Sequence, residues 1–216
     1  MAARDDLARV FADRGDGGRR LARELRRRSW VDPLVLGLAR GGVPVAAVVA
    51  RRLGAELDVV VARKIGAPGR REYGVGAVTA DGPAIYDEAI LRTLELTALR
   101  MTRTADRERA EARRRLERYR AGRPPVRVAG RDVVLVDDGL ATGVTATAAL
   151  RELRAARPRT VVFATPVAAP GAAARLRGEA DDVVCVAEPP SFRAVGQWYA
   201  DFHQIGDEDV LDLLDR

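Results

Sequence analysis

Two adjacent acids, Asp137 and Asp138, stand where an apolar run meets a loop of small residues. The run, residues 133–136, has no polar alternation, and residues 139–145 read Gly-Leu-Ala-Thr-Gly-Val-Thr. Helix-forming residues resume at Ala146, so the loop amides would sit at a helix N-terminus, where a phosphate is favoured. Two carboxylates beside such a cradle indicate a ligand with hydroxyls, or a bound Mg²⁺, next to its phosphate. Receiver domains and Walker B strands share the apolar run and acids, but the chain has no G-x-x-x-x-G-K-[ST] motif.

A second glycine-rich turn, at residues 40–42, follows the apolar run 33–39. Two glycines at the end of a strand can expose backbone N–H groups to an anion, and Arg40 adds a forked donor. The same pair could instead form only a tight turn between a strand and a helix.

The single lysine, Lys64, lies near the start of a long polar segment, residues 63–77, that is rich in glycine. A loop of this kind inside a compact fold is usually functional or disordered, and a mobile lid is its functional form. Lys64 could then meet a departing anionic group; a surface lysine without such a role is the alternative.

The elements that must position these residues alternate between strand and helix patterns. This order predicts an α/β fold, with a parallel sheet of about five strands and helices on both faces. The strands are expected at residues 33–39, 57–62, 133–136, 160–165 and 182–187, and the helices between them at 43–53, 146–156 and 170–177.

Other segments have weaker patterns. The glycines of residues 15–18 are expected to divide a helical region, residues 4–28, into two helices. Residues 75–79 and 83–86 are expected to form a hairpin through an Asp-Gly turn. Residues 87–120 are expected to form one long helix or a helix pair. The acidic tail is expected to form another helix.

Composition excludes several classes of protein. The 216 residues suit one domain, and no stretch approaches the roughly 18 consecutive apolar residues of a membrane span, so a cytoplasmic protein with no membrane partner is expected. One cysteine, Cys185, excludes an internal disulfide, and one histidine, His203, argues against a metal cluster. The net charge is +6, but 31 acids are interspersed among 37 bases, which makes nucleic acid an unlikely partner and suits anionic substrates.

Three segments together carry a family resemblance. VVLVDDGLATGVT, residues 133–145, resembles the phosphoribosyl pyrophosphate (PRPP) motif of the type I phosphoribosyltransferases. LGLARGGVPVAAVVARRLG, residues 36–54, is similar to the pyrophosphate loop of purine phosphoribosyltransferases, in which a peptide is often cis. ARKIGAPG, residues 62–69, is similar to the flexible catalytic loop of adenine-type enzymes.

The resemblance implies Mg²⁺-dependent transfer of the 5-phosphoribosyl group from PRPP to a small-molecule acceptor. It implies catalytic roles for Lys64, Asp137 and Asp138, with both aspartates holding the ribose hydroxyls and contacting the metal indirectly, through those hydroxyls or water. The implied substrate-binding residues are Ala39, Arg40 and Gly41 for pyrophosphate, and Gly139, Leu140, Ala141, Thr142, Gly143, Val144 and Thr145 for the 5′-phosphate.

We expect residues 32–188 to form the core of a single domain, and residues 189–216, with or without residues 1–28, to form a small hood. Trp198 of the hood could offer an aromatic face to the acceptor, although ordinary packing would explain it equally well. Relatives are usually dimers, so a homodimer is expected.

Departures from the family pattern concern the acceptor. Enzymes acting on 6-oxopurines carry an Asp where this chain has Ala141 and a Lys where it has Thr165, which disfavours those bases. The general base could be supplied by Glu72, Glu188 or His203. Two alternatives of another class are a PRPP- or nucleotide-binding regulator without turnover and a nucleic-acid binder that uses the arginine-rich helix.

Overall fold

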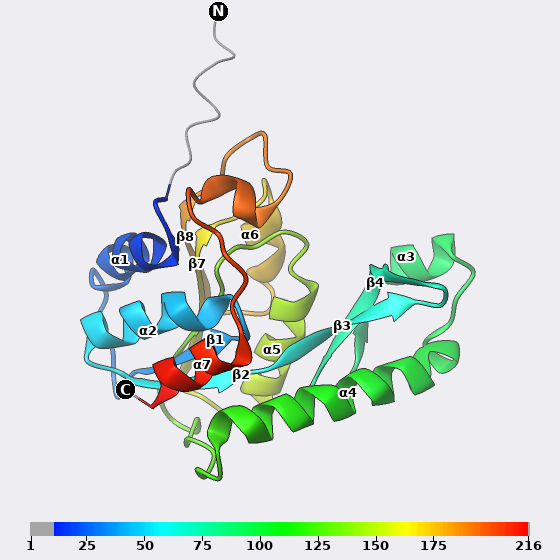
Figure 1. The fold of residues 1–216 in the computed structure, drawn as a ribbon, viewed down its shortest axis with the longest axis horizontal. Helices are drawn as coiled ribbons and strands as arrows, with labels where there is room; N and C mark the ends of the chain where they lie inside the picture. Colours follow the sequence, from blue (N-terminus) through cyan, green and yellow to red (C-terminus); the bar gives the residue numbers. More distant parts are fainter. Residues whose placement is uncertain (1–10, 216) are drawn as a thin grey trace, which may run out of the picture.

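The computed structural model describes residues 11–215, except the side chains of residues 71 and 72. Within this part of the chain, five parallel strands form a central sheet in the order β2-β1-β6-β7-β8 (Figure 1). The strands are β1 (Leu34–Leu38), β2 (Glu56–Val60), β6 (Asp132–Val136), β7 (Thr160–Val167) and β8 (Asp182–Ala187). The predicted α/β fold and its five strands are confirmed.

Both faces of the sheet are covered because successive strand residues point to opposite sides. Val35, Val134 and Val162 pack against α1 (Arg14–Leu25) and α2 (Gly42–Leu53). On the other face, the neighbouring residues Leu135 and Phe163 pack against α5 and α6. These helices span Val144–Ala155 and Ala172–Leu176. Two-sided burial explains why the strand sequences are apolar without alternation.

The prediction that glycines interrupt the first helix was wrong for the described residues. α1 begins at Arg14, is capped by Asp13, and runs straight through residues 15–18. A Cβ on Gly17 would lie 3.0 Å from Pro166, and one on Gly18 would lie 2.8 Å from the side chain of Val48. The glycines therefore let α1 approach the sheet and α2 closely, which offsets their low helix propensity. The part of the expected region before residue 11 lies outside the described residues.

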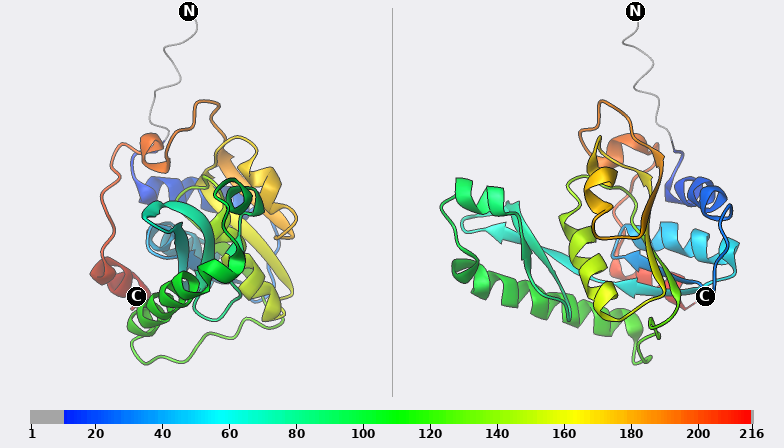
Figure 2. Two further views of the ribbon diagram at one scale, coloured as in Figure 1. Left: turned by 90° about the vertical axis from the view of Figure 1, so that its right-hand side faces the viewer. Right: turned by 180° about the vertical axis from the view of Figure 1, so that it is seen from behind.

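A separate arm projects from this body (Figures 1 and 2). It contains a three-stranded antiparallel sheet, in the order β3-β4-β5, and two helices. The bounds are β3 (Ala62–Ala67), β4 (Arg70–Thr79), β5 (Ile85–Tyr86), α3 (Glu88–Thr93) and α4 (Ala98–Arg120). The expected hairpin is confirmed by the pairing of Gly76 with Tyr86 and of Ala77 with Ile85, and the expected helix pair by α3 and α4.

The segment expected to be a long loop, residues 63–77, is instead a β-ribbon. β3 and β4 pair from Ala62↔Thr79 to Ala67↔Arg70, with a register shift on either side of Gly66. Ile65 and Val75 are buried against Leu91 and Met101 of the two helices. The arm thus has a small core of its own, and its apolar residues, spaced among glycines and arginines, give little strand signal in the sequence.

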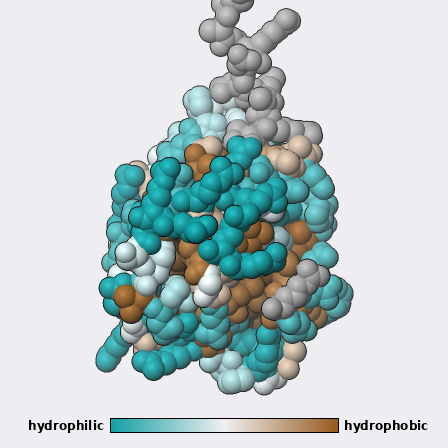
Figure 3. Space-filling model, turned by 90° about the vertical axis from the view of Figure 1, so that its left-hand side faces the viewer, coloured by the Kyte–Doolittle hydropathy of each residue, from teal (hydrophilic) through white to brown (hydrophobic). Residues whose placement is uncertain are grey.

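The start of the described chain packs against a segment near its C-terminal end, before α7. The Phe11 N–H donates to the Trp198 carbonyl, and the Phe11 ring packs on Tyr199 at 5.3 Å between centroids. A 3-10 helix, η2 (Val195–Trp198), and a terminal helix, α7 (Asp207–Leu214), complete this region. Figure 3 shows the side that carries α1 and α2, where apolar surface in the middle is surrounded by hydrophilic surface. No helix in residues 11–215 has the length and apolar character needed to cross a membrane.

Candidate active site

The carboxyl ends of β1 and β6 bring the predicted pyrophosphate turn and the acid pair together. Gly37 pairs with Val136, and the Ala39 N–H donates to the Val60 carbonyl at 2.9 Å. A Cβ on Gly41 would overlap the Asp138 carboxylate, and one on Gly42 would overlap the Val136 carbonyl. Only glycine fits at these two positions, which explains the pair. The peptide between Ala39 and Arg40 is cis.

Asp138 is buried and held on two sides. Its Oδ2 accepts from the Arg14 Nε at 2.8 Å, and its backbone carbonyl accepts from the Tyr199 hydroxyl at 2.6 Å. Burial raises the pKa of Asp138, although the Arg14 guanidinium opposes the shift. Burial and the neighbouring Asp138 carboxylate raise the pKa of Asp137 well above its ordinary value. Burial and mutual repulsion thus disfavour the ionised form of the pair, although Arg14 donates to Asp138 and the Asp138 N–H donates to Asp137 at 2.9 Å.

The loop after the acids is pinned by its backbone and open at its tip. The Leu140 N–H donates to the Val167 carbonyl at 2.8 Å, and the Leu140 carbonyl accepts from the Ala169 N–H at 2.7 Å. The Leu140 side chain lies in the core, so only its backbone could face a ligand. Ala141 and Thr142 are exposed. Gly143, with φ 83°, precedes α5, whose N-terminus has no side-chain cap. The first N–H groups of α5 are thus available to an anion.

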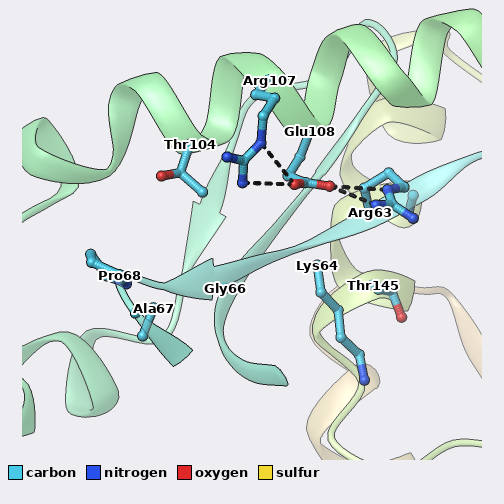
Figure 4. Close-up of a pocket in the computed structure, with 11 residues that line it drawn as sticks. Arg63, Lys64, Gly66, Ala67, Pro68, Thr104, Arg107, Glu108 and Thr145 are labelled. Carbon is cyan, nitrogen blue, oxygen red and sulfur yellow. Dashed lines mark hydrogen bonds and ion pairs between the residues drawn. The ribbon is translucent and has the colours of Figure 1, made fainter. Parts of the chain in front are cut away.

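Lys64 lines a cavity of about 620 Å³ between the arm and the start of α5. It lies on β3 opposite Ala77, is exposed, and extends toward the end of the cavity that Thr145 lines (Figure 4). Across the cavity, Glu108 of α4 accepts from Arg63 at 2.8 Å and from Arg107 at 3.2 Å. The three cations outnumber the one carboxylate, so the cavity favours anionic ligands.

The remaining predicted site residues differ in where they lie. Trp198 is only 2% exposed and stacks on Phe192 inside the hood, so the structure favours ordinary packing, and a substrate contact stays a prediction. Arg40 lies 3.6 Å from Asp207 of α7 and lines a pocket with Gly41 and Asp138. His203 lines the same pocket. Glu188 and His203 are exposed. The side chain of Glu72, the third candidate base, lies outside the described part of the structure.

Sequence reasoning missed two residues that contact the acid pair, Arg14 and Tyr199. Arg14 is one of many arginines and lies 124 residues from its partner, so nothing in the local pattern marks it. Tyr199 stands among several tail aromatics. Only their tertiary contacts with Asp138 identify them as parts of the site.

A divalent cation would need ligands from the substrate as well as the protein. No group of three or more metal-ligating side chains gathers anywhere in the described residues. Mg²⁺ usually binds through one or two carboxylates plus substrate phosphates and retains several waters. The pair Asp137 and Asp138 fits that mode, in which the metal arrives with a phosphorylated ligand.

Comparison with known proteins identifies the class. The family model of the phosphoribosyl transferase domain matches residues 11–203, and the chain belongs to this family. Two Mycobacterium tuberculosis proteins, from strains H37Rv and CDC 1551, carry provisional phosphoribosyl transferase names and are 45% identical over 208 residues. That match covers 96% of this chain and 47% of each relative, so the chain spans about half their length. The crystal structure of TT1426 from Thermus thermophilus is 48% identical, with a TM-score of 0.80, over 94% of this chain and 97% of that one.

Proposed function

We propose that this chain transfers the 5-phosphoribosyl group of PRPP to a nitrogenous acceptor and releases pyrophosphate, with Mg²⁺ as cofactor. One observation carries the proposal: an acid pair, an open glycine turn and an uncapped helix N-terminus meet at one rim of the sheet. Membership of the family supports the same activity.

Each group at the rim has a role in this reaction. Asp137 and Asp138 hold the ribose hydroxyls, the backbone of residues 139–145 binds the 5′-phosphate, and residues 39–41 bind pyrophosphate. The bond from the ribose C1 to the pyrophosphate oxygen breaks with its electrons on oxygen, while the acceptor nitrogen forms a new bond to C1. The nitrogen passes its proton to a general base, for which Glu72, Glu188 and His203 are the candidates. Bound Mg²⁺ would neutralise charge on the leaving pyrophosphate, held by the two aspartates through hydroxyls or water.

Lys64 acts on the leaving group in this proposal. Its ammonium group is exposed in the cavity and makes no ion pair among the described residues, so it is free to offset charge that develops on pyrophosphate. Lys64→Ala should lower turnover about 100-fold while leaving PRPP affinity unchanged. Steady-state kinetics and calorimetry measure the two quantities, and Arg70→Ala, at an exposed cation of the same ribbon, is the matched control. An unchanged turnover would remove Lys64 from the mechanism.

The acceptor is not a 6-oxopurine in this proposal. Ala141 offers no carboxylate to take a proton from the base. Thr165 is fully buried, and its hydroxyl donates to the Val167 carbonyl at 3.2 Å, so it cannot read a purine carbonyl.

The proposal is tested with PRPP, Mg²⁺ and a panel of acceptors that extends beyond nucleobases. Pyrophosphate release that depends on one acceptor would support the enzyme. Tight PRPP binding without turnover on any acceptor would assign the chain to the non-catalytic binders instead. Absence of PRPP binding would contradict both readings of the site.

A further inference from the structure

The first helix reaches the acid pair through one side chain. Arg14 is the first residue of α1, and its side chain is 8% exposed. Its Nε lies 2.8 Å from Oδ2 of Asp138, whose side chain is 13% exposed. A guanidinium buried this deeply needs a carboxylate partner, and here the partner is one of the two acids assigned to the ribose.

Arg14 is itself fixed in place. Its Nη1 donates to the His203 carbonyl at 2.9 Å, and its guanidinium lies 3.8 Å from the ring centroid of Phe202. The helix that carries it cannot slide easily, because Gly17 packs against Pro166 and Tyr199 with almost no spare space. The guanidinium therefore presents Nε to Asp138 in one orientation.

The surroundings of Asp138 make that orientation matter. Its carbonyl is held by Tyr199, and the Gly41 backbone lies against the carboxylate on the Oδ2 side. Of the two carboxylate oxygens, Arg14 takes Oδ2 and leaves Oδ1 without a bond from the guanidinium. A ribose hydroxyl at this rim would meet a carboxylate that is already oriented and partly neutralised.

We propose that Arg14 is a positioning residue of the active site, which holds Oδ2 of Asp138 so that Oδ1 faces the ribose hydroxyls. The inference rests on the proposed function, because it names a residue that prepares the same site for PRPP. It also gives α1 an indirect part in substrate binding, because Arg14 acts through Asp138 and not through contact with the ligand.

A merely structural ion pair would behave differently. Loss of a structural pair lowers stability and disturbs every ligand of the rim to a similar degree. A positioning role is selective, because only ligands that carry the ribose hydroxyls depend on Asp138. Inorganic pyrophosphate, which lacks the sugar, should bind at residues 39–41 without help from Arg14.

The experiment compares two ligands in the presence of Mg²⁺ by calorimetry. Arg14→Gln should weaken PRPP binding about tenfold or more, the loss of a charged hydrogen bond, and change pyrophosphate binding less than about twofold. Arg14→Lys keeps the charge but lacks the fork, so it should recover only part of the PRPP affinity. Arg20→Gln, which breaks an exposed pair with Asp16 on the same helix, is the control and should leave both affinities unchanged.

A double-mutant cycle with Asp138→Asn completes the test. If Arg14 acts through Asp138, Arg14→Gln should cost little further PRPP affinity in the Asp138→Asn background. Equal losses for PRPP and pyrophosphate, or full additivity in the cycle, would overturn the positioning role. Thermal melting shows whether each variant folds, and where Arg14→Gln does not, the lysine variant decides: wild-type PRPP affinity would overturn the proposal. Failure of the wild-type protein to bind PRPP would instead overturn the proposed function, and this inference with it.

Discussion

The two ends of strand β6 carry aspartates in opposite electrostatic situations. Asp132, at its start, is 1% exposed and accepts from the Val31 N–H and the Thr160 hydroxyl, each at 2.7 Å, and from Arg159. Burial alone would raise the pKa of Asp132, but these three donors outweigh it, so the pKa is lowered. Asp137, just beyond the other end, has its pKa raised by burial and by its acidic neighbour.

The difference separates an acid that is satisfied by the protein from an acid pair whose ionised form burial disfavours. Asp132 joins the starts of β6 and β7 to the segment before β1, and all of its donors come from the protein. At the rim, the donors from Arg14 to Asp138 and from the Asp138 N–H to Asp137 do not offset burial, so both pKa values stay raised. A buried carboxylate left short of partners costs stability, which is typical of functional sites.

The largest expected effect comes from removing the structural acid. Asp132→Ala leaves the Val31 N–H and the Arg159 guanidinium without their partner, so the free energy of unfolding should fall by about 3 kcal/mol. Urea unfolding measures the loss. PRPP affinity of the folded protein should stay close to wild type, and a loss below about 1 kcal/mol would contradict the structural role.

Asp137→Asn should keep stability and weaken PRPP binding, which is the reverse of the result expected for Asp132→Ala. The amide removes a charge that burial and Asp138 disfavour, so stability at pH 7 should hold or rise by about 1 kcal/mol. PRPP affinity should fall about 30-fold, because a charged acceptor for the ribose is lost. Calorimetry and urea unfolding measure the two changes, with Asp132→Asn as the matched control. Lower stability together with unchanged PRPP affinity would reverse the comparison.

The way in which stability and PRPP affinity depend on pH should also differ between the acid pair after β6 and Asp132 at its start. Because the pKa of the Asp137 and Asp138 pair is raised, its ionised form is lost at a higher pH than for ordinary carboxyls, and PRPP affinity should fall about tenfold per pH unit below that pKa. The stability that the pair contributes is fully present below the ordinary carboxyl pKa and lost as pH rises through the raised one.

Asp132 has the reverse sign: its contribution is present above the ordinary carboxyl pKa and lost as pH falls through the lowered one. Calorimetric titrations of PRPP between pH 5 and pH 8, together with unfolding of Asp137→Asn and the wild type over the same range, test the direction for the acid pair. Unfolding of Asp132→Asn and the wild type as the pH falls below about 4 tests the direction for Asp132. A PRPP affinity that stays constant across this range would show that the pair is ionised at ordinary pH and would weaken the contrast.

The smallest effect is expected from the removal of a single hydrogen-bond donor to Asp132. Thr160→Val removes the hydroxyl that donates to Asp132 but keeps the shape of the side chain, so the cost should be about 1 kcal/mol. Two other donors remain on Asp132. Urea unfolding detects this change, and a cost as large as that of Asp132→Ala would mean that the three bonds do not act separately.

The central sheet was predictable from sequence because burial on two sides leaves a strong local signal. Val133 to Val136 can hardly be anything other than an inner strand, and the glycines at 41 and 42 mark the close approach of the turn to Asp138. The arm was not predictable as a unit. Its strands are held by contacts from Ile65 and Val75 to helices that follow later in the chain, and glycines conceal the alternation.

The site was predictable only in part. Residues 137–145 carry their chemistry in consecutive positions, so the sequence shows them together. Arg14 and Tyr199 join them from opposite ends of the chain, and Trp198 turns inward although it is adjacent to Tyr199. Neighbouring aromatics in an irregular tail point to different sides, and no periodicity tells which one reaches the site.

Lys64 belongs to an arm with its own core, and this sets how it can travel. Only Val61 separates β2 of the sheet from β3 of the ribbon, and α4 returns from the tip of the arm to the body. Any displacement that brings the ammonium group toward the rim therefore also displaces α3 and the first turns of α4. Because Lys64 lies on a strand of this core, its position relative to the rim depends on the orientation of the whole arm about the connection at Val61.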